Sequence, residues 1–248
     1  MNEKHTASDV CHVTKPGLVT LEIRKLSTYL WIATAIVLGL GVMREVVVHN
    51  IGTETFLKDL RHFALDLEYS LPAWYESLTM ATASVLLATI AILARHHDPR
   101  NRWAWTLLAV IFILMSVDEV VSFHEVAIKP IRHAFNLSGV LYFSWVVLAA
   151  PMLVILTIIF IPFMLRLPRR TALRFTIAAI LFVGGAFGLE FSGGHYVTIG
   201  GFDSLPYRIV SSCEESLEII GMTLFVTSLF RHLAGVTPVL HVTIKDGT

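Results

Sequence analysis

Six stretches of mostly apolar residues recur along the chain, separated by short polar segments. A helix needs about 17–25 such residues to cross the hydrocarbon of a bilayer. The stretches are Thr28–Val48, Ala73–Ala94, Trp103–Phe123, Leu141–Leu165, Leu173–Leu189 and Tyr207–Phe230. The pattern therefore predicts an all-α protein, folded as a bundle of six transmembrane helices.

The segment between the first two stretches is too polar to span a membrane. Four apolar residues recur in it at helical spacing, with charged residues between them: Phe56, Leu60, Phe63 and Leu67. This pattern is typical of an amphipathic helix that lies on the membrane surface. We therefore expect one short surface helix over 56–68, after which Pro72 turns the chain into the second span.

The composition supports a lipid environment and limits the partners. Charged residues make up 15% of the chain, whereas soluble domains average about 25%, and the mean hydropathy is +0.69. The formal net charge is zero, so the overall basic charge of a nucleic-acid-binding protein is absent. Cys11 and Cys213 form neither a metal motif nor a disulfide framework, and a six-span topology places them on opposite sides of the membrane.

The basic residues are unevenly distributed. Lys and Arg concentrate in the N-terminal tail, in the loops before spans three and five, and in the C-terminal tail. All of these segments fall on one side of a six-span bundle, which the positive-inside rule identifies as the cytoplasm. We therefore predict a cell-membrane protein with cytoplasmic tails at 1–27 and 233–248 and a membrane domain at 28–232. Acidic residues gather in the outward half, which that rule does not require.

Span three ends in an acidic sequence. Asp118, Ser122 and Glu125 share one helix face, and Glu119 flanks it. His124 points away from this face in a regular helix and joins it only if the helix bends. A charged side chain at the centre of a membrane helix costs about 2.5–3.5 kcal/mol on insertion scales, so such residues indicate function.

Two later spans bring more acids to the same depth. In span six, Glu214 and Glu218 share a face and Glu215 lies at its edge. Three glutamates in a dry core must share protons, neutralise a cation or meet water. Span five contributes Glu190 near the outer boundary and His195 just past it. We expect these groups from three helices to form one site.

Carboxylates with one or two imidazoles suit a divalent metal such as Zn²⁺, Fe²⁺ or Mn²⁺. The predicted ligands are Asp118, Glu119, His124, Glu125, Glu214, Glu218 and His195. Glu190 and Glu215 are the predicted catalytic residues, one of them acting as a general base. The leading hypothesis is a metal-dependent enzyme, a hydrolase or an oxidoreductase, whose outward-facing site acts on a lipid or another amphiphile.

Three other interpretations stay open. Chains of acids in membranes also relay protons, so the protein can be a transporter or channel for protons or cations. A non-catalytic assembly factor or receptor subunit is compatible with the same sequence. Finally, the acids can serve assembly alone if they pair with Arg44 or Arg208.

The acidic motifs carry a resemblance. Asp118-Glu119, His124-Glu125 and Glu214-Glu215-x-x-Glu218 resemble motifs of a set of uncharacterised bacterial multi-pass membrane proteins. The stretch from Leu67 to Tyr75 is also similar to their approach to the second span, and the resemblance covers most of the chain. It implies no activity. A zinc site within a helical bundle is similar to alkaline ceramidase-type hydrolases by analogy only, because this chain has no His-x-x-x-His.

Overall fold

The computed structural model describes residues 22–52 and 56–237, with the side chains of 56–59 excepted. Every regular element in these ranges is a helix, which confirms the all-α prediction. Most of the two predicted tails lies outside the described residues, as does Cys11. Its separation from Cys213 therefore stays a prediction.

Six helical segments are long and apolar enough to cross a membrane, which confirms the predicted number of spans among the described residues. The first four are α1 (Ile23–Ile51), α2 (Leu71–His97), α3 (Arg102–Val121) and α5 (Val146–Arg166). The fifth is continuous over Arg169–Gly200 and comprises α6 (Arg169–Val183), a π-helical segment η3 (Gly184–Leu189) and α7 (Glu190–Gly200). The sixth is α8 (Leu205–Val236). The chain is a multi-pass integral membrane protein.

The surface segment is shorter than the sequence pattern predicts. A 3₁₀ helix, η1, covers Phe56–Phe63, and irregular backbone follows it as far as Ser70. The helix stops because the chain turns inward at Leu65, which is 2% exposed. Leu65 packs on the bare backbone of Gly41 in α1, where an added Cβ would lie 2.6 Å from Leu65 Cγ. The predicted amphipathic helix over 56–68 is thus reduced to its first part.

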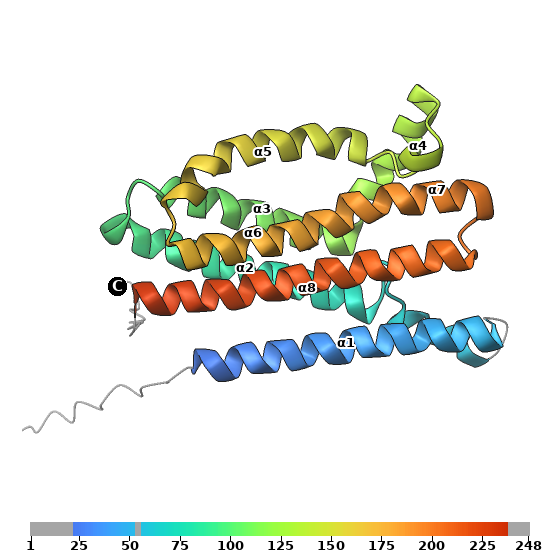
Figure 1. Cartoon of the computed structure of the whole chain (residues 1–248), viewed down its shortest axis with the longest axis horizontal. Coiled ribbons are helices and arrows are strands. Elements are labelled where there is room, and N and C mark those ends of the chain that lie inside the picture. The colour runs from blue at the N-terminus through green and yellow to red at the C-terminus, as the bar shows by residue number, and fades with distance from the viewer. Residues whose placement is uncertain (1–21, 53–55, 238–248) are drawn as a thin grey trace, which may run out of the picture.

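Two further short helices follow α3. A left-handed residue, Ser122, ends α3, and α4 (Phe123–Phe135) then projects from the bundle (Figure 1). A 3₁₀ turn, η2 (Gly139–Leu141), leads back to α5. The predicted fourth span, Leu141–Leu165, therefore begins as a transmembrane helix only at Val146.

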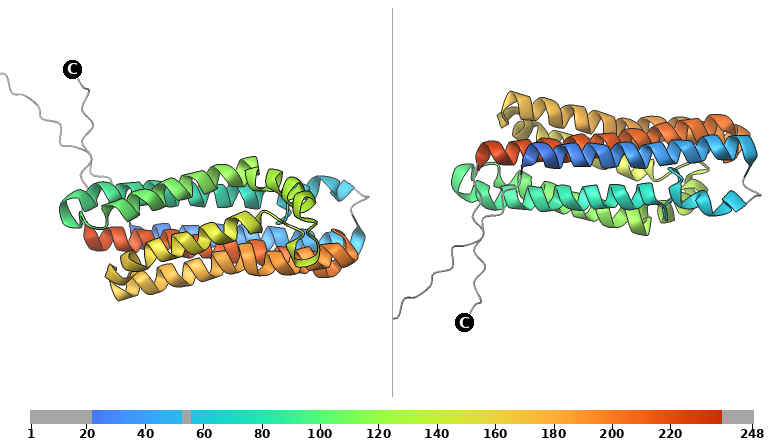
Figure 2. Two further views of the ribbon diagram at one scale, coloured as in Figure 1. Left: turned by 90° about the horizontal axis from the view of Figure 1, so that it is seen from above. Right: turned by 90° about the horizontal axis from the view of Figure 1, so that it is seen from below.

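Four spans form a curved wall, and α5 covers its open side. The helices α3, α2, α8 and α6 pack side by side in that order, and α1 packs on α8 and α2 from outside. Figure 2 (left) shows α5 lying over the gap between α3 and α6. The wall and α5 together surround the interior of the bundle.

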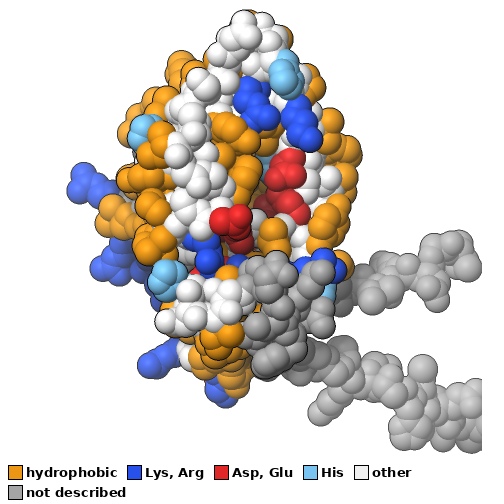
Figure 3. All heavy atoms as spheres, turned by 90° about the vertical axis from the view of Figure 1, so that its right-hand side faces the viewer, with side chains coloured by type: hydrophobic (Ala, Val, Ile, Leu, Met, Phe, Trp, Pro, Cys, Tyr) orange, Lys and Arg blue, Asp and Glu red, His pale blue; other side chains and the backbone are white. Residues whose placement is uncertain are grey.

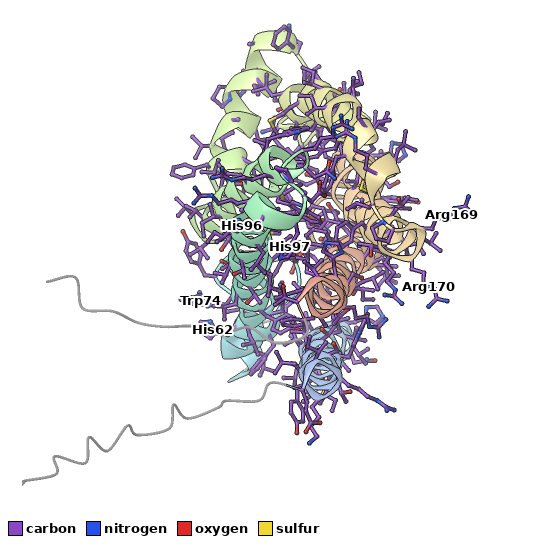
Figure 4. The ribbon with its side chains drawn as sticks, turned by 90° about the vertical axis from the view of Figure 1, so that its left-hand side faces the viewer. His62, Trp74, His96, His97, Arg169 and Arg170 are labelled. Atoms are coloured by element: carbon purple, nitrogen blue, oxygen red, sulfur yellow. The ribbon has the colours of Figure 1, made fainter. Side chains whose placement is uncertain are left out.

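The two ends of the bundle differ in charge. At one end, called the basic end here, lie the start of α1, the end of α8 and the loops that join α2 to α3 and α5 to α6 (Figure 1). Figure 4 views this end and labels Arg169 and Arg170. The opposite end, called the acidic end, carries α4, η1 and the acidic sequences of α3, α7 and α8.

A packed apolar core fills the interior toward the basic end. Trp105 of α3 is 1% exposed and meets Phe163 of α5 edge-on, with ring centroids 4.7 Å apart. Phe175 of α6 and Phe225 of α8 extend this aromatic packing, with centroids 4.9 Å apart. The interior is therefore closed by apolar side chains in one half, and its acids lie in the other.

Candidate carboxylate and histidine site

Four glutamates from three helices converge inside the acidic half. This central carboxylate cluster consists of Glu76 of α2, Glu119 of α3, and Glu215 and Glu218 of α8. Their carboxyl groups lie close enough for their charges to interact with one another. Figure 3 views the acidic end, where acidic side chains gather near the middle of the face. The predicted convergence of span three and span six therefore occurs, with α2 as an additional contributor.

Glu76 is the least solvent-exposed member of the cluster. Its residue is 1% exposed, and its Oε1 atom is buried without a hydrogen-bond partner. A buried carboxylate oxygen without a partner destabilises the fold, because no protein hydrogen bond replaces those it made to water. A proton on the carboxyl group or a bound cation would satisfy this oxygen.

No basic side chain of the described residues pairs with this cluster. Among the described residues, no ion pair joins any of its four glutamates to Lys or Arg. Instead, Arg208 donates through Nε and Nη2 to Glu45 Oε2, at 3.0 and 2.5 Å, and Arg44 also pairs with Glu45. The interpretation that Arg44 and Arg208 balance the intramembrane acids therefore finds no support in these pairs.

Asp66 lies beside this arginine group, outside the spans. Burial raises the pKa of the Asp66 carboxyl, and the charge of Glu45 raises it further, although Arg44 and Arg208 oppose the shift. Both arginines lie near enough to Asp66 for their charges to act on its pKa, but their ion pairs are with Glu45. Among the described residues, neither arginine forms an ion pair with the central carboxylate cluster.

A break between helices α3 and α4 brings His124 to the site. Ser122 adopts left-handed backbone angles (φ 57°, ψ 41°), and the chain reverses direction enough for His124 to fold back on Asp118. The backbone N–H of His124 donates to Asp118 Oδ1 at 3.1 Å, and its Nδ1 lies 2.8 Å from Oδ2. Its Nε2 lies 3.8 Å from Glu68 Oε1. The sequence predicts that His124 joins the acidic face only if the helix bends. The helix does end at Ser122, and His124 lies against Asp118.

Three acids around this imidazole raise its proton affinity. Burial lowers the pKa of His124, but the hydrogen bond and charge of Asp118, together with Glu68 and Glu119, outweigh burial and raise it. Burial has the opposite effect on the neighbouring carboxyl group of Glu68, whose pKa it raises. When Asp118 holds Nδ1, the Nε2 atom is free to exchange a proton or bind a metal. His124, Asp118 and Glu68 are called the His124 group below.

A second acid pair lies between α7 and α8. The carboxyl groups of Glu190 and Glu214 are within hydrogen-bonding reach of each other, an arrangement that needs a shared proton or cation. Trp145, at the start of α5, donates its Nε1–H to Glu190 Oε1 at 2.6 Å. The ring of Trp145 also lies 5.4 Å from those of His124 and Phe187. Trp145 therefore links the His124 group to the Glu190–Glu214 pair.

The π-helical segment η3 determines how closely α6 and α7 approach α8. At Gly185, an added Cβ would lie 2.8 Å from the backbone oxygen of Glu214 and 2.9 Å from Glu218 Cγ. Only a glycine permits this approach. π-helical turns recur at functional sites, and this one is directly followed by Glu190.

Two predicted ligands lie away from these groups. Glu125 is exposed on α4, and His195 is exposed on α7 with its ring 5.6 Å from that of Tyr196. In the part of the chain that the structure describes, no hydrogen bond or ion pair joins either residue to the cluster. No three His, Cys, Asp or Glu side chains among the described residues are arranged as a ready metal cage.

Three residues of the site were not among the predicted site residues. Glu68 and Glu76 lie at the same depth as the acidic motifs, which is a signal in the sequence, but neither belongs to a repeated acidic pattern. Trp145 has the sequence context of an interfacial anchor. Its hydrogen bond to Glu190 depends on tertiary packing, so the residues around Trp145 in the sequence give no signal of it.

The comparisons with known proteins place the chain within one family. A family model described as a domain of unknown function matches residues 29–233, a range that includes all but the outermost ends of the six spans. No curated protein and no solved structure matches the chain.

Proposed function

The chain belongs to the DUF8692 family, and we propose that it is a membrane enzyme that binds a divalent metal at the central carboxylate cluster. Its substrate would be a lipid or another amphiphile. The observation that carries this proposal is the burial of Glu76 among Glu119, Glu215 and Glu218 with no basic partner. Buried like charges that interact need a cation or shared protons, and no described side chain hydrogen-bonds to Glu76 Oε1.

The donor set supports a metal chemically. Carboxylate oxygens with a nearby imidazole suit Zn²⁺, Fe²⁺ or Mn²⁺. Glu76, Glu119 and Glu218 come from three different helices, so a metal that they held would connect α2, α3 and α8. His124 can supply a nitrogen through Nε2, because Asp118 holds its Nδ1.

A bound metal would supply a Lewis acid that polarises a carbonyl or phosphoryl group. The protein side chains then divide the remaining tasks. If the carboxylates alone hold the metal, His124, which Asp118 orients, can instead exchange a proton at Nε2. Glu190, held by Trp145, and Glu215 are the two further carboxylates available as general bases. Hydrolase or oxidoreductase chemistry is compatible with this set.

A one-sided site is favoured over a conduit. A transporter or channel needs polar groups along its whole path, whereas Trp105, Phe163 and Phe225 close the interior at the basic end. The positive-inside rule assigns the basic end to the cytoplasm, so the proposed site opens to the outer face of the cell membrane. Ion flux through reconstituted liposomes would speak for the conduit instead.

Elemental analysis of the detergent-purified protein tests the proposal. We expect wild type to carry stoichiometric divalent metal and the Glu76→Gln and Glu218→Gln variants to carry less. Glu22→Gln is the matched control, because Glu22 pairs with Lys25 at the basic end. Metal-free wild type that takes up no Zn²⁺, Fe²⁺ or Mn²⁺ on addition would sink the proposal.

A further inference from the structure

A cavity opens at the acidic end, beside the carboxylate groups described above. It has a volume of about 480 Å³ and lies between the end of α4, the residues around η2, the end of α7 and the turn into α8. Arg132, Ser138, Tyr142 and Thr198 are polar residues of its lining, and it is called the Arg132 cavity below. Sites for small molecules have volumes of about 300–1,000 Å³, so the cavity is large enough for a ligand.

Arg132 supplies a positive charge to this cavity, and an aromatic ring supports it. The Cζ atom of Arg132 lies 4.2 Å from the centroid of the Tyr142 ring, in a cation–π contact. Among the described residues, Arg132 donates no side-chain hydrogen bond and forms no ion pair. The ring contact engages the face of the guanidinium group, so its N–H donors, which lie in the plane, are available to a ligand.

Arg132 differs in this respect from two other arginines at the acidic end. Arg44 and Arg208 both pair with Glu45. Asp203 follows the lining residue Phe202 in the chain, yet in the described structure it forms no ion pair with Arg132. The charge of Arg132 is therefore available to an anion that comes from outside the chain.

Hydroxyl groups complete the polar part of the lining. Thr198 Oγ1 accepts the N–H of Gly139 at 3.1 Å and donates to the Gly194 carbonyl oxygen at 2.9 Å, which joins η2 to α7. Ser138 precedes η2 without capping it through its side chain, so its hydroxyl can donate to a ligand. A guanidinium group with a hydroxyl nearby suits the oxygens of a phosphate.

The surroundings of the cavity are apolar. Phe135, Val140, Ile199 and Phe202 are all exposed, and each is a lining residue or lies within two residues of one. At the end of a transmembrane bundle, exposed apolar and aromatic side chains favour the boundary between hydrocarbon and head groups. A phosphate that is attached to lipid chains fits these surroundings better than a free phosphate from water.

We propose that the Arg132 cavity binds the phosphodiester head group of a membrane phospholipid, with the phosphate on Arg132 and the acyl chains in the bilayer. The juxtaposition of a ring-supported arginine, a hydroxyl group and apolar surroundings in one cavity carries this inference. It goes beyond the proposed function, because it assigns a second binding site that needs no metal.

The cavity is connected to the candidate site through aromatic rings. The rings of Tyr142 and Phe143 lie 5.2 Å apart, and Phe143 stacks on Tyr207 with centroids 6.4 Å apart. Tyr207 in turn lies near enough to Glu190 and Glu214 for their charges to act on its phenol group. A phospholipid in the cavity is therefore separated from this acid pair by a short row of aromatic side chains.

Native mass spectrometry of the delipidated protein in detergent tests the inference, with dioleoylphosphatidylglycerol as the probe. We expect wild type to bind this lipid tightly. Dioleoylglycerol, which has the same chains without the phosphate, should bind much more weakly. Glycerol phosphate, which has the head group without the chains, should not displace the lipid at equal concentration.

Two basic residues of α4 provide the matched pair. Arg132→Gln should weaken binding of dioleoylphosphatidylglycerol about tenfold, the usual worth of a charge-assisted hydrogen bond. Lys129→Gln removes the same charge from the same helix outside the cavity lining, so it should bind like wild type. Arg132→Lys keeps the charge without the planar fork and should give an intermediate affinity.

Ser138→Trp is a second variant, which fills the cavity and keeps Arg132. It should also weaken binding, and unchanged melting temperatures would show that both variants are folded. Equal affinity of Arg132→Gln and Lys129→Gln, or of dioleoylphosphatidylglycerol and dioleoylglycerol, would overturn the inference. Displacement of the lipid by glycerol phosphate at equal concentration would assign the cavity to a soluble phosphate and would overturn it too.

Metal analysis of the same samples separates this inference from the proposed function. We expect Arg132→Gln to keep its metal, because Arg132 lies outside the central carboxylate cluster. Lipid binding that depends on Arg132 in a protein that takes up no metal would overturn the proposed function alone. Bound metal together with lipid binding that ignores Arg132 would overturn this inference alone.

Discussion

At the scale of single residues, one backbone conformation decides what His124 can do. Ser122 takes up the left-handed angles that L residues rarely adopt, and the imidazole thereby meets Asp118 at 2.8 Å. A helix continued through this point would have turned the ring away. A strained, non-glycine residue beside an acid–imidazole pair is typical of a functional site.

The His124 group predicts a pH-dependent stability. The pKa of His124 is raised above its ordinary value of 6.5, so the protonated ring stabilises the fold. This contribution is complete below pH 6.5 and is lost as the pH rises through the raised pKa. We expect Asp118→Asn to weaken this decline, as measured by melting temperatures between about pH 5.5 and pH 9.

His133→Gln is the control for this measurement. His133 is exposed on α4 and forms none of the ion pairs found in the described part of the chain, so its replacement should preserve the wild-type profile. A profile that stays the same in Asp118→Asn would remove the argument for an oriented, protonated His124.

Glu76 offers a second prediction at the same scale. We expect the metal-free Glu76→Gln variant to be at least as stable as metal-free wild type, because glutamine has no charge to bury. Added Zn²⁺ or Mn²⁺ should raise the melting temperature of wild type and raise that of the variant much less. An equal response of both proteins would show that Glu76 is not a ligand.

At the scale of elements, the π-helical segment η3 determines how closely α7, which carries Glu190, approaches the glutamates of α8. Gly185→Ala places a methyl group against the Glu214 backbone and Glu218 Cγ. Overpacking of this kind costs about 1–3 kcal/mol. We expect lower stability and weaker metal retention, measured by thermal melting and elemental analysis.

The same segment contains its own control. Gly188 has open space where a Cβ would be added, so Gly188→Ala should leave metal retention intact and keep or slightly raise stability. Equal behaviour of the two alanine variants would contradict the close approach at Gly185.

The sequence predicted elements better than their junctions. The six spans follow from apolar stretches, because lipid forces each such stretch into a helix. The short elements follow from particular tertiary contacts: η1 ends where Leu65 enters the groove at Gly41, and α4 exists because Ser122 breaks α3. Neither contact has a periodic signal.

The site shows the same division. Glu119, Glu215 and Glu218 were predicted because acids inside spans are rare and costly. Glu76 was less visible, because it is a single acid near a helix start, where interfacial residues are common. Its burial against α3 and α8 depends on how the spans pack, which hydropathy does not encode.

At the scale of the whole molecule, the apolar core and the proposed site occupy opposite halves of the bundle. The apolar core at the basic end holds α3, α5, α6 and α8 together. We expect Phe163→Ala to cost about 3 kcal/mol, measured by unfolding in mixed micelles, and to leave the metal content unchanged.

Ile158→Ala is the counterpart on the same helix. Ile158 is 63% exposed, so its truncation should change stability little. Loss of metal from Phe163→Ala would indicate that the two halves of the bundle are coupled.

The position of α5 over the gap between α3 and α6 also has a consequence for biogenesis. With a mean hydropathy of 2.7 in its most apolar window, α5 can leave the translocon and settle in lipid unaided. By contrast, α8 has a value of 1.5 and carries three glutamates. It is synthesised after the other five described spans, so its acids can insert directly against α2 and α6. The order of synthesis thus lets the least apolar of the six spans pack against helices that are already in the membrane.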